Sequence, residues 1–142
     1  MKILKRTITT TAAPDKVFPY LADFENAVEW DHGTVSCTRI SGDGGPGTTY
    51  RNVSKFAGRE IELIYTVEKL AEPTFVIVGS NATTTSQDTM VVRPNGTGSD
   101  VIYTAKFTFS GVARVLEPFL SPFLAKLGDA VVTSMKTALD RL

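Results

Sequence analysis

Asp88 is the residue of this sequence best placed to do chemistry. It lies in a segment of alternating residues, 85–93, in which Met90 and Val92 make its face apolar. A carboxylate on such a face is desolvated and its pKa rises, so it can act as a general base or anchor a hydroxyl or amine of a ligand. The alternatives are a carboxylate that is hydrogen-bonded near the start of the strand, or a register that leaves it outside.

Hydroxyl and amide side chains share the faces that we expect to point inward. Tyr50, Asn52 and Tyr65 have the same parity in the two strands of one hairpin, and Tyr103 has it in a later strand. Buried phenols and amides need hydrogen-bond partners, so these groups can orient a ligand carbonyl or stabilise an enolate. The alternative is a set of core residues bonded to one another or to buried water.

Other catalytic and binding chemistries find little support. The chain has one histidine, His32, and one cysteine, Cys37, so the four N/S ligands of a structural zinc site are missing and we expect no metal or other cofactor. No Gly-x-Ser-x-Gly motif accompanies His32, which argues against a nucleophilic hydrolase. Residues 42–47 are glycine-rich but lack the ending of a phosphate-binding loop, which predicts a turn. Arg59 can extend into solvent or bind an anionic group at a cavity mouth.

Length and composition describe an ordinary globular domain. The 142 residues are 42% hydrophobic, and 15 basic residues balance 15 acidic ones, so we expect a single domain, 1–142, that binds no nucleic acid. One cysteine excludes an internal disulfide and agrees with a reducing compartment. The first residues lack the apolar stretch of a secretion signal, and no run of 18 apolar residues occurs. We therefore expect a cytoplasmic protein with no stable membrane insertion.

Alternation and turn signals predict the elements that must position these side chains. We expect a first strand at 3–11, short helices at 14–21 and 24–30, and a long helix at 112–142. Between them, short turns separate six strands that should pair antiparallel: 34–40, 48–56, 59–70, 74–79, 85–93 and 101–109. Pro118 and Pro122 should confine regular helix mainly to the part after Pro122, with an irregular or kinked segment before it.

One hairpin can be aligned residue by residue. A two-residue turn at 57–58 places Tyr50 opposite Tyr65, with the apolar side chains on their face. The other face then carries charges, with Arg51 diagonal to Glu62. The consistency of both faces supports the register.

Several motifs, read together, resemble a known family. They are Ala13-Pro14-Asp15-Lys-Val-Phe, Phe24-Glu-Asn-Ala-Val-Glu-Trp30-Asp31, Gly45-Pro-Gly47-Thr-Thr-Tyr50-Arg51, Asp88-Thr-Met-Val-Val-Arg-Pro94 with Gly98-Ser-Asp-Val-Ile-Tyr103, and Phe109-Ser-Gly111. With the order of elements, they resemble the polyketide cyclase/dehydrase and lipid-transport family of the START-like (SRPBCC, helix-grip) superfamily. The resemblance implies an α+β helix-grip fold. Its curved seven-stranded antiparallel sheet would wrap on a long C-terminal helix, with two short helices after the first strand.

The resemblance also implies a cavity between the sheet and the C-terminal helix, and a small hydrophobic ligand that is lipid-, polyketide- or aromatic-like. The alternative is a polyketide cyclase/dehydratase- or isomerase-type enzyme acting on an enolisable substrate, with Asp88 as the proton acceptor; whether the protein is an enzyme stays open. A third interpretation, a regulatory module that uses the outer sheet face, lacks a clear exposed apolar patch. We expect a monomer or homodimer.

The residues that we expect to line this cavity come from the inner faces of the strands and from the apolar stripe of the last helix. They are Tyr50, Asn52, Ser54, Phe56, Leu63, Tyr65, Met90, Tyr103, Phe107, Phe123, Leu127 and Val131. The opening is expected near residues 56–58, 80–83 and 109–116.

Overall fold

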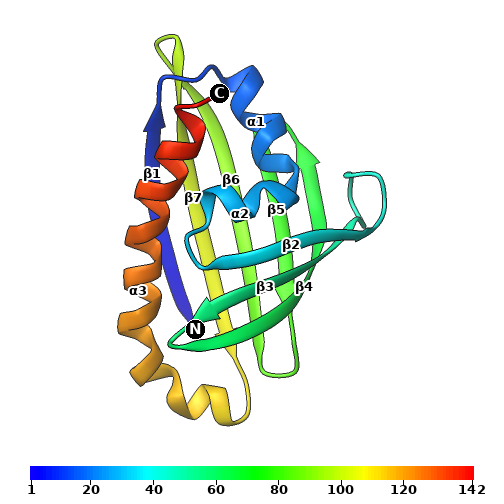
Figure 1. Ribbon diagram of the computed structural model, residues 1–142, viewed down its shortest axis with the longest axis vertical. Helices are drawn as coiled ribbons and strands as arrows, with labels where there is room; N and C mark the ends of the chain where they lie inside the picture. The colour runs from blue at the N-terminus through cyan, green and yellow to red at the C-terminus, as the bar shows by residue number, and fades with distance from the viewer.

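Seven strands and a long final helix make up most of the computed structural model, which describes residues 1–142 (Figure 1). The strands are β1 (Lys2–Thr10), β2 (Thr34–Ser41), β3 (Thr49–Phe56), β4 (Arg59–Ala71), β5 (Thr74–Ser80), β6 (Thr84–Asn95) and β7 (Gly98–Phe109). The helices are α1 (Pro14–Ala22), the 3-10 turn η1 (Phe24–Asn26), α2 (Ala27–Trp30) and α3 (Val112–Leu139). The order of elements is the predicted one.

The strands form a single antiparallel sheet in the order β1-β7-β6-β5-β4-β3-β2. The sheet is strongly curved, so that β2 and β3 run across the direction of β6 and β7 in Figure 1. Helix α3 lies along β1, and α2 contacts both α3 and β2. This is the predicted helix-grip architecture. No helix in the structure has both the length and the apolar character needed to cross a membrane.

The register of the β3–β4 hairpin is the predicted one. Tyr50 pairs with Tyr65, and the Arg51 guanidinium lies 2.8 Å from the Glu62 carboxylate on the other face. The turn at 57–58 has positive φ at both residues, 51° and 79°, as a tight hairpin turn requires. The hairpin between β6 and β7 is tighter than predicted, because its strands continue to a pair at Asn95 and Gly98.

Helix α3 continues through both of its prolines, so the predicted irregular segment does not occur. The alternative of a kink describes it better, since the first turns run at an angle to the rest of the helix in Figure 1. Proline removes a backbone donor and crowds the preceding turn, which bends a helix without ending it. Beyond Pro122, the helix places Leu124, Val131 and Met135 against the sheet side of the molecule, where they are buried.

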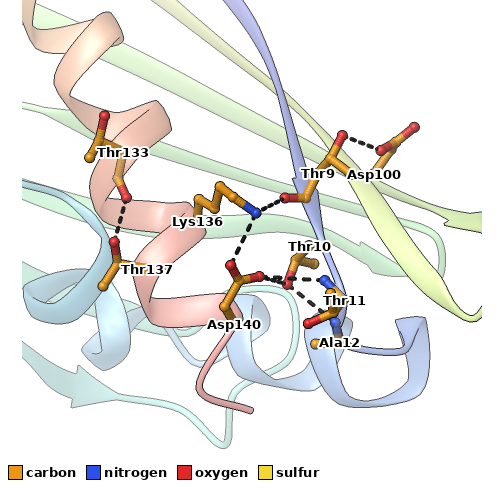
Figure 2. A network of polar contacts seen from close by, with 9 residues as sticks. All are labelled: Thr9, Thr10, Thr11, Ala12, Asp100, Thr133, Lys136, Thr137 and Asp140. Atoms are coloured by element: carbon orange, nitrogen blue, oxygen red, sulfur yellow. Dashed lines mark hydrogen bonds and ion pairs between the residues drawn. The ribbon is translucent and has the colours of Figure 1, made fainter.

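A polar network fixes the C-terminal end of α3 to β1 (Figure 2). The Lys136 ammonium donates to the Thr9 carbonyl at 3.1 Å and lies 3.0 Å from the Asp140 carboxylate. The Thr10 hydroxyl donates to Asp140 at 2.6 Å. This end of the helix is therefore held by both backbone and side-chain groups of the first strand.

Aromatic side chains fill the half of the sheet that α1, η1 and α2 cover. The Phe24 ring lies 5.7 Å from that of Tyr50 and 4.8 Å from that of Tyr65, measured between centroids. Trp30 is fully buried with its ring 5.9 Å from that of Tyr103. This half of the concave face is packed solid, which leaves the other half for any cavity.

Candidate functional site

A cavity of about 600 Å³ lies between the concave face of the sheet and α3. Strands β3, β4, β6 and β7 supply most of its walls on one side, and α3 supplies the other. Of its 27 lining residues, 16 are hydrophobic, so the walls suit a largely apolar guest.

Periodicity explains how each element reaches the cavity. On α3, Leu120, Leu124, Leu127 and Val131 follow one another at intervals of three or four residues and so share a helix face. On the strands, every second residue points inward.

Asp88 is buried on the cavity wall, with 4% of its surface exposed. Its carboxylate accepts hydrogen bonds from the Ser86 hydroxyl at 3.0 Å and from the Tyr103 hydroxyl at 3.4 Å. Burial, together with the negative charge of Asp31, raises the pKa of Asp88 to about 7, and the two hydrogen bonds oppose this shift. Asp88 is thus a carboxyl group that changes charge near neutral pH.

A second carboxylate, Asp31, lines the same cavity. It follows α2 and accepts hydrogen bonds from the Gly33 amide at 3.1 Å and the Thr34 hydroxyl at 3.0 Å. Burial raises its pKa, while these two bonds and the nearby His32 lower it. Asp31 was not among the predicted site residues, because the Asp-x-Gly-Thr pattern at 31–34 indicates only a turn.

Two tyrosines complete a group of polar residues that we call the polar end of the cavity: Asp31, Tyr65, Ser86, Asp88 and Tyr103. Burial and the charge of Asp88 raise the pKa of both tyrosines well above the usual value for phenols. Both therefore stay neutral and keep their protons. The Tyr65 ring lies against Gly79 of β5, where a Cβ would come within 2.6 Å of the ring.

The cavity opens to solvent where its lining residues are exposed. Its exposed lining residues, which we call the mouth, are Lys55, Ala57, Arg59, Glu60, Thr83 and Leu116. They lie in or near the three segments where the sequence predicted an opening. The two cationic residues of the cavity wall, Lys55 and Arg59, both belong to the mouth.

Nine of the candidate residues from the sequence line the cavity: Ser54, Phe56, Leu63, Tyr65, Asp88, Tyr103, Phe107, Leu127 and Val131. Four others do not: Tyr50, Asn52, Met90 and Phe123. Alternation along a strand identifies the inner face, but it does not say how far along that face the empty space extends.

Tyr50 and Met90 are inner-face residues that belong to the solid half of the core. Tyr50 packs against Phe24 of η1, and Met90, the next inner residue after Asp88, is fully buried between its strand neighbours Phe75 and Tyr103. The helices that follow β1 exclude a guest from this half.

Asn52 and Phe123 lie outside the cavity for local reasons. The Asn52 amide accepts a hydrogen bond from the Ser54 hydroxyl at 2.7 Å and donates one to the Thr34 hydroxyl at 3.4 Å. Both polar atoms of its side chain therefore already have partners within the protein. Phe123 is 51% exposed, and its ring packs edge-on against Phe56 at 6.2 Å. The inward position that the sequence predicted for Phe123 is taken by its neighbour Leu124, which follows Leu120 by four residues.

Other lining residues were not among the candidates. They include Leu4, Asp31, Gly33, Ser86, Ala105, Phe109, Leu120, Leu124 and Gly128. Ser86 shares the parity of Asp88, and Leu120 belongs to the apolar stripe of the predicted helix, so these two carried a usable signal. Leu4 and Gly33 carried none, because only the tertiary fold brings β1 and the loop after α2 to the cavity.

A curved antiparallel sheet that grips a long C-terminal helix around an internal cavity defines the helix-grip class of proteins. The family model described as polyketide cyclase / dehydrase and lipid transport matches residues 1–142. The chain belongs to this family. No curated protein matches the sequence.

Solved structures share the fold at low sequence identity. A START superfamily protein from Mycobacterium smegmatis is 14% identical, with a TM-score of 0.82 over 98% of this chain and 97% of that one. The Zhui aromatase/cyclase from Streptomyces sp. R1128 is 12% identical, with a TM-score of 0.82 over 99% and 94%. A STAR-related lipid transfer protein from Xanthomonas axonopodis is 11% identical, with a TM-score of 0.75 over 96% and 85%. At these identities the likeness shows the fold alone.

Proposed function

We propose that the protein binds one small, largely apolar molecule in the cavity between the sheet and α3. The observation that carries this proposal is the cavity itself: about 600 Å³, lined mainly by hydrophobic residues, which is within the usual range of ligand sites. Membership of a family whose description includes lipid transport supports it. Burying about 200 Å² of apolar ligand surface would contribute about 5 kcal/mol before the cost of ordering the ligand.

The mouth provides the route of entry in this proposal. Its residues belong to the β3–β4 hairpin, the residue just before β6 and the first turns of α3. Of these, the α3 turns carry the most exposed apolar side chains, with Phe119 73% exposed. A guest would enter between the hairpin and this helix segment and reach the polar end last.

Two measurements test the proposal. Native mass spectrometry of the purified protein, followed by organic extraction, should identify a co-purifying apolar molecule. Titration with the neutral apolar dye Nile red should show saturable binding to one site per chain. A protein that carries no extractable molecule and leaves the dye unbound contradicts the proposal.

A pair of variants locates the binding. Ala105 is buried on β7 and lines the cavity, so Ala105→Phe fills part of it and should weaken dye binding about ten-fold or more. Thr104 is the neighbouring residue on the opposite face of the strand, so Thr104→Phe adds the same ring outside and should leave binding unchanged. Circular dichroism checks that both variants fold. If Ala105→Phe and Thr104→Phe lose binding equally, the dye binds outside the cavity.

An enzyme acting on an enolisable substrate is a second candidate, favoured by the environment of Asp88. A carboxylate with a pKa of about 7 suits a general base near neutral pH. It would take a proton from the carbon next to a carbonyl group, and the carbonyl oxygen would accept the electron pair and a hydrogen bond from Tyr65 or Tyr103.

Deuterium exchange separates this candidate from simple binding. The extracted molecule is incubated with the protein in D₂O, and mass spectrometry follows the uptake of deuterium at carbon. Uptake that disappears in Asp88→Asn, while dye binding persists, supports an enzyme. No uptake with the wild-type protein supports a carrier.

A further inference from the structure

The polar end of the cavity is unbalanced in charge. It holds two carboxylates, Asp31 and Asp88, whereas the cationic lining residues, Lys55 and Arg59, are exposed at the mouth. None of the ion pairs in the structure includes either carboxylate. Buried carboxylates are normally paired with a cation, because an isolated buried charge is costly.

The hydrogen bonds at the polar end do not remove this imbalance. Asp31 accepts from the Gly33 amide and the Thr34 hydroxyl, and Asp88 accepts from the hydroxyls of Ser86 and Tyr103. All these donors are neutral. They solvate the carboxylates but leave the negative charge in place.

Tyr65 offers an independent indication that a guest group belongs here. Its side chain is more than nine-tenths buried and lines the cavity. The Ser86 hydroxyl lies beside that of Tyr65 and donates its own hydrogen bond to Asp88 at 3.0 Å. The Ser86 oxygen can accept the Tyr65 proton, but no donor in the structure reaches the lone pairs of the Tyr65 hydroxyl, so these are available to an N–H or O–H group of a guest.

We propose that the ligand carries a protonated amine, which binds at the polar end between Asp31 and Asp88, while its apolar body fills the rest of the cavity. This inference rests on the proposed ligand-binding function and specifies the chemical class of the ligand. An ammonium group supplies the missing positive charge and several N–H donors. A carboxylate or phosphate group would meet two like charges, and a neutral hydroxyl would leave both charges unbalanced.

The protonation behaviour of Asp88 agrees with this arrangement. Burial and the charge of Asp31 raise its pKa to about 7 when no cation is bound. Of the groups that face it, Asp31, Tyr65 and Tyr103 are titratable, and α3 contributes only apolar side chains to this part of the wall. A bound ammonium group would lower the pKa of Asp88, so binding of an amine should strengthen as pH rises from 6 to 8.

A matched series of ligands tests the proposal. Decylamine, decanol and decanoate share one chain length and differ in the head group, and each is titrated against the Nile red complex at pH 8, where an alkylamine remains protonated. We expect decylamine to displace the dye at a concentration about ten-fold lower than decanol does, and decanoate to be the weakest.

Variants then assign the preference to the carboxylates. Asp88→Asn and Asp31→Asn should each reduce the advantage of decylamine over decanol several-fold. Asp129→Asn is the control, because this carboxylate on α3 does not line the cavity, is 73% exposed and pairs with Arg6. Circular dichroism checks that the variants fold. Asp31→Asn is the variant at risk, because both hydrogen bonds of Asp31 stabilise its own loop. If it does not fold, Asp88→Asn alone tests whether the carboxylates cause the preference for the amine.

The outcomes separate this inference from the proposed function. If Nile red binds and decanol displaces it as well as decylamine does, the amine is excluded and apolar binding stands. The same holds if the preference survives in Asp88→Asn or if affinity for decylamine falls as pH rises from 6 to 8. If the wild-type protein does not bind the dye and no member of the series binds, both proposals fail together.

Discussion

The two ends of α3 differ in almost every physical respect. At the C-terminal end, Met135 and Leu139 are fully buried, and Lys136 and Asp140 bind β1. At the N-terminal end, apolar side chains such as Phe119 are mainly exposed, and the helix starts without a side-chain cap. The C-terminal end is an anchor, whereas the N-terminal end covers the cavity mouth and is tied by one ion pair, between Glu117 and the ammonium group of Met1 at 2.8 Å.

This difference assigns stability and access to separate parts of one helix. Local opening costs least where few apolar contacts and many exposed backbone groups occur, as in the turns before Pro122. Those turns border the mouth, and moving them aside would break the ion pair between Glu117 and Met1 but none of the hydrogen bonds at the anchored end.

Truncation at the anchored end should be the most damaging change. Met135→Ala removes a fully buried side chain and should lower the free energy of unfolding by about 4 kcal/mol. Phe119→Ala removes a larger but exposed side chain and should change it by less than about 0.5 kcal/mol. Urea denaturation of both variants measures the difference. Comparable losses would show that the mouth segment is as firmly packed as the anchor.

The polar end, which lies between these two regions, should make stability depend on pH. Because the pKa of Asp88 is raised to about 7 in the folded protein, its contribution is present at low pH and is lost as pH rises through 7. Asp88→Asn does not titrate there. Relative to this variant, the wild-type protein should lose about 3 kcal/mol of unfolding free energy between pH 5 and pH 8. Parallel pH profiles would mean that Asp88 ionises as an ordinary carboxyl group.

Weakening the polar network should loosen the anchor by a smaller amount. Thr10→Val keeps the shape of a buried side chain and removes its hydrogen bond to Asp140, which should cost about 1 kcal/mol. Thr108→Val, an exposed position on β7, is the matched control and should be nearly neutral. Thermal unfolding measures the stability of both variants. If Thr10→Val is as stable as the wild-type protein, the polar network does not contribute to holding this end of the helix.

The contrast should also appear in the unmodified protein. Amide hydrogens of residues 112–121 should exchange at least about a hundred-fold faster than those of residues 131–139. Hydrogen exchange followed by mass spectrometry or NMR resolves the two segments. Uniform protection along α3 would contradict the division between anchor and cover.

Local patterns predicted much of this molecule. The β3–β4 register followed from a two-residue turn and from two faces of opposite character, and the inward direction of Asp88 followed from alternation with Met90 and Val92. Both patterns depend only on residues that are close together in the chain, so they can be recognised in a single sequence.

The extent of the cavity could not be predicted in this way. Met90 and Asp88 share a face, yet one is core and the other lines the cavity, because η1 and the short helices fill only one half of the sheet. Asp31 reaches the polar end from a loop, where no periodicity applies. Phe123 lies outside because its neighbour Leu124 takes the inward position on α3, and helical periodicity alone allows either residue to do so.

Gly79 shows how a residue that never touches a guest can decide which guest fits. It leaves the space in which the Tyr65 ring lies, since a Cβ there would come within 2.6 Å of the ring. A homologue with alanine at this position would have to tilt the ring into the cavity and accept a smaller molecule, although its lining residues were identical. Ligand range can therefore diverge between relatives through a position that a comparison of binding residues would leave out.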